Sequence, residues 1–125
     1  MKPHSWQSVS PPAEAQATTF TLTINGQQEE GFIVRTNGIL HAYINRCPHA
    51  GTTLDWLPGR FFSADGTALV CQTHGAMFAP AGGARLSGPC DSGLTPLPIR
   101  EHDGQVQVPS SIMQINTAKP DTLGA

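Results

Sequence analysis

The sequence predicts a small, antiparallel, loop-rich all-β domain. Three observations lead to this expectation. Glycine and proline number 13 and 11 in a chain of 125 residues, which favours turns and short strands over long helices. Several short apolar runs are separated by turn-forming dipeptides. No stretch of the sequence sustains a 3.6-residue apolar period, so a helical bundle is excluded.

The expected strands follow one another along the middle of the chain. The first, 19–24, alternates strictly and places three apolar side chains on one face and three threonines on the other. Three hairpins are expected where Asn-Gly or Asp-Gly lies between two apolar runs. Their arms are 32–35 with 39–44, 61–62 with 69–70, and 97–99 with 106–108.

The composition changes at both ends of the chain. Residues 1–17 are rich in Ser, Pro, Ala and Gln without a hydrophobic period, which predicts a flexible arm or one that folds only against something else. Residues 18–109 are expected to form one domain, in keeping with the chain length. Residues 110–125 read as a tail, in which Ile112, Met113 and Ile115 could add one short strand or turn.

Charge and composition exclude several functions and indicate a compartment. The formal net charge is −2 and Lys plus Arg number only 7, so no basic stripe is available for nucleic acid. No apolar run is long enough to span a membrane, and the N-terminus lacks the apolar stretch of a secretory signal. The three cysteines are odd in number, which argues against a disulfide framework. We therefore expect a cytoplasmic protein that binds neither membrane nor nucleic acid.

Two short segments each combine a cysteine with a histidine. They are Cys47-Pro48-His49 and Cys71-Gln72-Thr73-His74, and each follows an expected strand. Two thiolates and two imidazoles make a complete set of four metal ligands. Zinc fingers usually group Cys with Cys and His with His, whereas here each loop offers one of each. That order suits a two-iron cluster with one iron on the two sulfurs and the other on the two nitrogens. A structural zinc site on the same residues is the alternative.

With these motifs, the chain resembles a Rieske-type [2Fe–2S] ferredoxin over roughly residues 18–109. The resemblance rests on Cys47–Gly51, Cys71–Phe78, Gly82-Gly83 and Gly88-Pro89. It implies a Rieske-type sandwich or barrel with a loop-rich cluster-binding subdomain. It also implies a [2Fe–2S] cofactor with the following ligands: Cys47 and Cys71 on one iron, His49 and His74 on the other. The spacing between the two motifs is longer than is common in the family, which predicts an extra hairpin or a longer loop within 57–66.

The same resemblance implies a role in electron transfer. A soluble one-electron carrier of this kind accepts electrons from a flavin-dependent ferredoxin reductase and donates them to a terminal oxygenase. The chain has no room for the additional iron domain of a Rieske oxygenase, so we expect an electron carrier without catalytic residues. The alternative is a small subunit or regulatory module of a larger redox complex, similar to the small subunit of nitrite reductase.

The residues around the second motif predict a low reduction potential. High-potential relatives in cytochrome bc complexes carry a serine just after the His-Gly of the second motif, a tyrosine two residues further on, and a disulfide between the two loops. The corresponding residues here are Ala76 and Phe78, and the disulfide positions correspond to Thr52 and Thr73. None of these features is therefore present. Cys90 is expected to be a small buried residue outside the ligand set.

Overall fold

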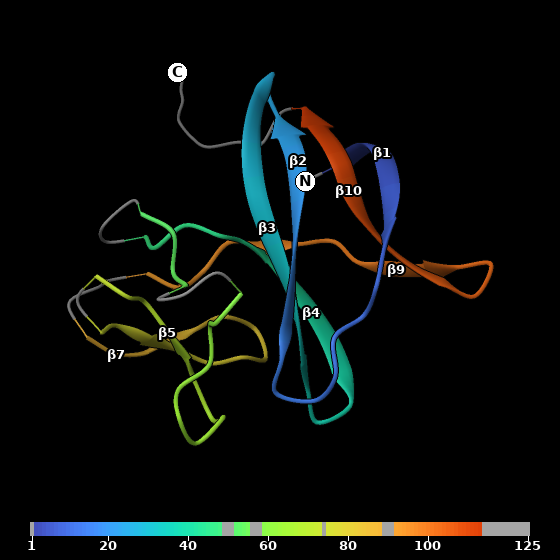
Figure 1. The fold of residues 1–125 in the computed structure, drawn as a ribbon. Coiled ribbons are helices and arrows are strands. Elements are labelled where there is room, and N and C mark those ends of the chain that lie inside the picture. Colours follow the sequence, from blue (N-terminus) through green and yellow to red (C-terminus); the bar gives the residue numbers. More distant parts are fainter. Residues whose placement is uncertain (1, 49–51, 56–58, 74, 89–91, 114–125) are drawn as a thin grey trace.

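The computed structural model describes residues 2–48, 52–55, 59–73, 75–88 and 92–113, and its strands form two sheets of unequal size (Figure 1). Over those residues every regular element is a strand, which confirms the all-β prediction. Among them, no helix is long and apolar enough to cross a membrane.

The larger sheet has seven strands. It contains β1 (Lys2–Val9), β2 (Ala17–Ile24), β3 (Gln27–Thr36), β4 (Ile39–Ile44), β8 (Pro96–Leu97), β9 (Arg100–His102) and β10 (Gln105–Met113). The order is β1-β10-β2-β3-β4-β8, with β9 also pairing with β10. All pairs are antiparallel except the short contact between β10 and β2. The sheet curls as it crosses the molecule (Figure 1).

Two-residue turns connect β2, β3 and β4. Asn25 and Gly26 both have positive φ, at 49° and 83°, and Asn37 and Gly38 repeat this with 52° and 77°. Positive φ at both central residues is the type I′ geometry, whose twist matches that of the flanking strands. The strand expected at 19–24 and the hairpin expected around Asn37-Gly38 are therefore confirmed.

The β3–β4 hairpin is buried on both faces and separates two hydrophobic cores. Phe32 and Val34 of β3 point into one core, and Ile33 points into the other. Tyr43 of β4 joins the first core, while Ala42 and Ile44 join the second. Burial on both sides explains why this part of the sequence is a continuous apolar run instead of an alternating one.

The smaller sheet lies to one side of the larger one, at the left in Figure 1, and consists of β5 (Leu69–Val70), β6 (Met77–Phe78) and β7 (Arg85–Ser87). The first core lies between the two sheets. Within it the rings of Phe32 and Phe61 stack with centroids 4.1 Å apart. The hairpin expected around Asp65-Gly66 is present in reduced form, because Phe62 and Leu69 form an isolated bridge. Asp65 accepts hydrogen bonds from Ser63 and Thr67, which lower the pKa of its carboxyl group to about 2.

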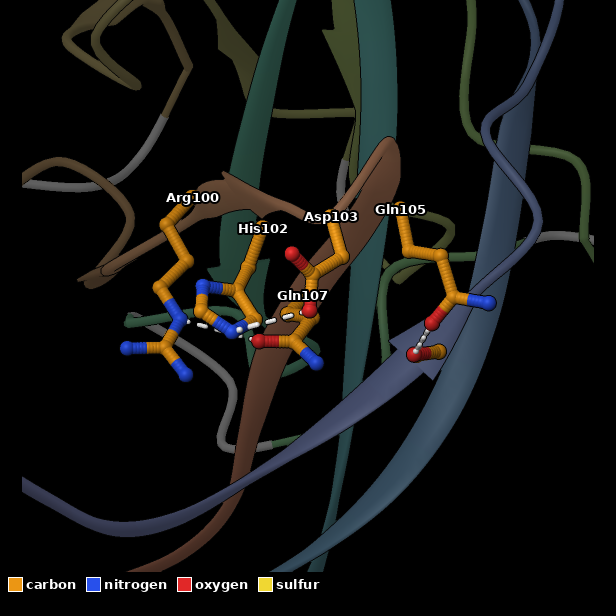
Figure 2. A network of polar contacts seen from close by, with 6 residues as sticks. Arg100, His102, Asp103, Gln105 and Gln107 are labelled. Carbon is orange, nitrogen blue, oxygen red and sulfur yellow. Dashed lines mark hydrogen bonds and ion pairs between the residues drawn. The ribbon is translucent and has the colours of Figure 1, made fainter.

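Residues 2–9 form β1 and pair along their length with β10, where a flexible arm was one of the two expectations. The arm thus folds against another part of the chain. The guanidinium group of Arg100 lies 4.1 Å from the ring centroid of Trp6. The Ser8 hydroxyl donates to the side chain of Gln105, which lies close to the β9–β10 turn (Figure 2). Backbone pairing and these long-range contacts hold β1 in place. The strand therefore forms although its sequence shows no hydrophobic period.

The last hairpin differs from the prediction in one of its arms. The expected turn is present, with φ of 53° at Asp103 and 74° at Gly104, but its first arm is β9 and not 97–99. A two-residue turn requires paired residues directly on either side, which here are His102 and Gln105. Leu97 instead pairs with Ala42 of β4. Strand β10 continues to Met113, beyond the expected domain end at 109.

Candidate metal centre

Cys47 lies at the start of a loop that follows β4. Its side chain is 1% exposed, and its N–H donates to the Thr52 carbonyl at 2.7 Å, which closes the loop. Because it directly follows the β4 segment, Cys47 is buried in the first core, at the end of the molecule that carries the smaller sheet.

Asn45 holds this loop and was missed in the sequence analysis. Its side chain is 5% exposed, and its Oδ1 accepts the Leu54 N–H at 2.8 Å. Its Nδ2 donates to Glu30 at 2.8 Å and to Asp55 at 3.2 Å. One buried amide thus joins β3 to both sides of the loop. The only signal in the sequence is the position of this Asn, two residues before Cys47. Its role in holding the loop depends on partners that only the folded structure shows.

Cys71 lies at the start of the second loop, directly after β5. It too is 1% exposed, and its N–H donates to the Ala76 carbonyl at 2.8 Å. The Gly75 N–H donates in turn to the Cys71 carbonyl at 3.0 Å. Gly75 has φ of 73°, a conformation that glycine adopts without strain. Each loop is therefore closed by a hydrogen bond from its cysteine N–H to a carbonyl five residues further on.

The two thiols are buried together as free cysteines. Burial raises the pKa of the Cys71 thiol; the N–H and hydroxyl groups of Thr73 oppose this shift, and the neighbouring Cys47 reinforces it. Around the cysteines lie apolar side chains of the first core, among them Leu54, Phe61 and Phe78. Two soft sulfur donors in an apolar, partly enclosed setting suit a metal that binds thiolate.

Hydrogen bonds connect the two loops directly. The Gln72 N–H donates to the Leu54 carbonyl at 2.9 Å, and the Gln72 side chain donates to the Thr53 carbonyl at 3.2 Å. The hydroxyls of Thr52 and Thr73 are 2.8 Å apart, although both residues are exposed. These are the two positions that the resemblance assigned to a disulfide, and the structure places them side by side.

A third segment packs against the second loop. A Cβ at Gly88 would lie 2.5 Å from the Ala76 Cα, so only glycine allows this approach. A Cβ at Gly83 would likewise lie 2.9 Å from Cε1 of the Tyr43 ring. The Tyr43 hydroxyl donates to the Pro80 carbonyl at 2.6 Å and anchors the β6–β7 loop to the larger sheet.

The structure thus brings together two of the four predicted ligands, Cys47 and Cys71. The other two, His49 and His74, lie outside the described residues, as does Cys90. Of the remaining histidines, His102 is on the β9–β10 hairpin, on the opposite side of the molecule from the smaller sheet (Figure 1).

The family model for the Rieske [2Fe–2S] domain matches residues 5–107. The chain belongs to the Rieske [2Fe–2S] domain family. The match begins within β1 and ends within β10, so it includes both loops. A Rieske domain carries a [2Fe–2S] cluster in which histidines replace cysteines on one iron. The residues of this Rieske protein fit that group, because two buried thiols lie together and one histidine follows each of them in the sequence.

Solved structures share this Rieske fold. The ferredoxin of carbazole 1,9a-dioxygenase from Nocardioides aromaticivorans IC177 matches with a TM-score of 0.64 and 23% identity, over 84% of this chain and 97% of that one. The terminal oxygenase of carbazole 1,9a-dioxygenase from Novosphingobium sp. KA1 matches with a TM-score of 0.62 and 21% identity, over 92% of this chain and 32% of that one.

A reduced complex between oxygenase and ferredoxin in carbazole 1,9a-dioxygenase also matches, with a TM-score of 0.63 and 18% identity, over 95% of this chain and 30% of that one. This Rieske chain therefore spans nearly all of the ferredoxin, but only about a third of the other two chains. A search of curated proteins found no match.

Proposed function

We propose that this protein is a Rieske ferredoxin, a one-electron carrier that passes electrons from a flavin-dependent reductase to a terminal oxygenase. The observation that carries the proposal is the pair of hydrogen-bonded loops that bury Cys47 and Cys71 together, in a domain of the Rieske family. A Rieske cluster supplies reversible one-electron chemistry.

The proposed ligands are Cys47 and Cys71 for one iron and His49 and His74 for the other. The position of the two cysteines supports half of this set, since both thiols lie in the first core. The sequence supports the other half, because each cysteine is followed by a histidine two or three residues later. The apolar walls of the first core keep water away from the sulfurs, and the loops end at the protein surface, at Thr52 and Thr73.

The structural match to a ferredoxin supports the role of an electron carrier. The chain covers 97% of that ferredoxin, and another structural match is a complex between the oxygenase and the ferredoxin of carbazole 1,9a-dioxygenase. We place the partner surface over the two cysteine loops, where the distance for electron transfer is shortest. The flavin-dependent reductase would use the same surface. We propose the cytoplasm as the compartment.

We propose a potential in the low part of the Rieske range, which extends from about −150 to +300 mV. Ala76 is 1% exposed and Phe78 is fully buried, and neither carries a hydroxyl that could donate to a sulfur. A donor near a sulfur would stabilise the additional negative charge of the reduced state. A low potential suits delivery of electrons to an oxygenase.

The experiment is visible absorption and EPR spectroscopy of anaerobically purified protein, before and after dithionite. We expect a red-brown oxidised sample and a rhombic reduced signal with an average g below that of all-cysteine clusters. A colourless protein with stoichiometric zinc and no iron would refute the proposal in favour of a structural zinc module. Stoichiometric co-purification with a larger enzyme would instead favour the subunit of a redox complex.

Single variants test the ligand set. Cys47→Ser, Cys71→Ser, His49→Ala and His74→Ala should each abolish the rhombic signal. The matched controls are Cys90→Ser and His102→Ala, which remove the same groups outside the proposed set; His102 lies on the far hairpin (Figure 1). Retention of the signal in any of the four ligand variants would remove that residue from the set.

A further inference from the structure

Two Asn-Gly pairs occupy equivalent turns at opposite ends of β3. Asn25-Gly26 joins β2 to β3, and Asn37-Gly38 joins β3 to β4. All four residues are exposed and have positive φ, and nothing lies within 4 Å of a Cβ built on either glycine. The two pairs share their sequence, their turn type and their open surroundings, so their hydrogen bonds are what distinguishes them.

An Asn-Gly pair can deamidate without an enzyme. The glycine nitrogen attacks Cγ of the asparagine: the N–Cγ bond forms, the nitrogen loses its proton, and the Cγ–Nδ2 bond breaks to release ammonia. Water then opens the succinimide ring to aspartate or isoaspartate, so the reaction consumes water and releases ammonia. Glycine favours the attack because it has no side chain in the way and its backbone rotates easily.

The Glu14 carboxylate holds one of the two pairs. Its Oε1 accepts the Gly38 N–H at 3.0 Å, and its Oε2 accepts the Asn37 N–H at 2.7 Å. Hydrogen bonds to an ionised acceptor are stronger than those between neutral groups. The Gly38 nitrogen must leave this acceptor before it can turn toward Cγ, and the nearby carboxylate opposes the negative charge that develops on the nitrogen.

The segment that carries Glu14 is itself fixed to β3. The Ala15 N–H donates to the Arg35 carbonyl at 2.9 Å, and Nε of Arg35 donates to the Pro12 carbonyl at 2.8 Å. Glu14 and Arg35 also form an isolated parallel bridge. Contacts on both sides of Glu14 therefore position its carboxylate at the turn.

The turn at the other end of β3 has no such carboxylate. Among the described residues, no side chain accepts the Gly26 N–H. The Asn25 N–H donates to the Ile112 carbonyl at 2.8 Å, which extends the short parallel pairing of β2 with β10. The attacking nitrogen of this pair is therefore not held by a charged acceptor, while the turn itself is part of the contact with β10.

We propose that Asn25-Gly26 is a deamidation site of this protein, and that the Glu14 carboxylate protects Asn37-Gly38 from the same reaction. Isoaspartate formed from Asn25 lengthens the main chain inside a two-residue turn, so it loosens β2 from β10 at Ile112. The proposal concerns the polypeptide alone and does not depend on the cluster.

The test follows both pairs in one molecule. Purified, cluster-loaded protein is incubated anaerobically in mildly alkaline buffer, and its peptides are analysed by mass spectrometry with fragmentation. Trypsin cleaves after Arg35, so the two pairs fall in different peptides. Asn25 should deamidate faster than Asn37 by about fivefold or more, the factor that one ordinary hydrogen bond represents. Equal rates, or a faster reaction at Asn37, would overturn the proposal.

Variants of Glu14 identify the cause of the difference. Glu14→Ala removes both acceptors and should raise the rate at Asn37 by about fivefold. Glu14→Gln keeps one acceptor without the charge and should raise this rate less. A general loosening of the fold would raise both rates, so the ratio of the Asn37 rate to the Asn25 rate is the quantity compared.

Glu29→Gln is the matched control for these variants. It removes an equal charge from β3, but one that binds Arg46 and not the turn, so the ratio should not change. An unchanged ratio in the Glu14 variants would contradict protection. A lower ratio would do so as well, because it would show that the carboxylate acts as a base and promotes the reaction.

The consequence for β10 has a separate measurement. Ion exchange isolates the deamidated protein through its additional negative charge, and urea unfolding compares it with the variant Asn25→Asp. The variant has the same charge without a lengthened main chain. The isoaspartate-containing fraction should therefore unfold at a lower urea concentration than the variant. Equal midpoints would overturn the loosening of β2 from β10.

Discussion

Ala76 and Phe78 are the side chains at which an added hydroxyl would change the chemistry of the cysteine loops. Both are buried in the first core beside Cys71. The double variant Ala76→Ser with Phe78→Tyr should raise the potential, because each new donor favours the reduced state. A hydrogen bond that strengthens by about 1.4 kcal/mol on reduction corresponds to about 59 mV for one electron. A redox titration measures the shift.

Phe62→Tyr is the control for this prediction. Phe62 packs against the same core but lies in the segment before β5, outside both loops, so its hydroxyl should leave the potential unchanged. If the potential of the double variant does not rise while its iron content is normal, the missing hydroxyls do not explain a low potential.

Tyr43 is the single tyrosine of the chain and reports directly on the contact between the two sheets. Burial raises the pKa of its hydroxyl above the usual value of 10.0, and a hydrogen bond from Gly82 partly opposes this. The folded state therefore holds the proton more tightly than the unfolded state, so the stabilisation is complete below about pH 10 and is lost as the pH rises above it. Urea unfolding between pH 8 and 11 should show this loss.

Tyr43→Phe separates the two roles of the hydroxyl. The variant loses the hydrogen bond to the Pro80 carbonyl and should be less stable at pH 8 by about 1–2 kcal/mol. Its stability should also fall less steeply above pH 10, because the titrating group is gone. Equal slopes for both proteins would show that the hydroxyl ionises as freely in the folded state as in the unfolded chain.

Asn45 concentrates three loop contacts in one buried amide, so its loss should be costly. Asn45→Ala leaves the Leu54 N–H without its acceptor and removes the donors to Glu30 and Asp55. We expect a loss of about 2–3 kcal/mol in the free energy of unfolding and a lower iron content per chain. Urea denaturation and iron analysis measure these two quantities. Wild-type stability in this variant would show that the loop does not depend on the amide.

At the scale of whole elements, β1 depends on contacts with the other end of the chain. Trp6 is half-buried, and the Arg100 guanidinium lies over its ring. Trp6→Ala should lower the free energy of unfolding by about 2 kcal/mol, through lost apolar burial and a lost cation–π contact. The visible spectrum should not change, because β1 and β9 lie away from the smaller sheet (Figure 1). A shifted urea midpoint with an altered spectrum would contradict this separation.

The elements that could be predicted from sequence are those whose cause is local. Asn-Gly and Asp-Gly between two apolar runs favour positive φ at both residues, so the turns at 37–38 and 103–104 were predictable. β1 was not, because its partner β10 is nearly the whole chain away. The first arm of the last hairpin was predicted at 97–99 because that segment contains apolar residues. The observed arm, Arg100–His102, is exposed.

The same distinction holds for the candidate site. The two cysteines could be proposed as ligands from the sequence, because the pairing of a Cys with a His is visible within four residues. The role of Asn45 depends on Glu30 and Leu54, which are remote in sequence from one another. Likewise, only the folded chain shows that the hydroxyls of Thr52 and Thr73 meet.

At the scale of the whole molecule, the two cores share one hairpin. Since β3 and β4 contribute to both, they cannot open without exposing apolar surface on both faces. Backbone amides of Ile33 and Ala42 should therefore exchange with solvent only by global unfolding. The Gln72 amide, in an exposed loop, should exchange through smaller openings. Native-state hydrogen exchange in low denaturant compares the three, and equal opening energies would contradict this hierarchy.

The pairing of β1 with β10 also determines the order in which the chain can fold. Lys2 lies opposite Met113, and the hydroxyls of Ser5 and Ser110 meet at 2.6 Å. By contrast, the β2–β3–β4 meander joins neighbours through two-residue turns and can form early, as a local nucleus. Closure of the sheet by β10 has to wait until residues 105–113 have left the ribosome. Until then the edge of β2 at Thr23 and Ile24 has no partner strand, and an open strand edge can pair with another chain during synthesis.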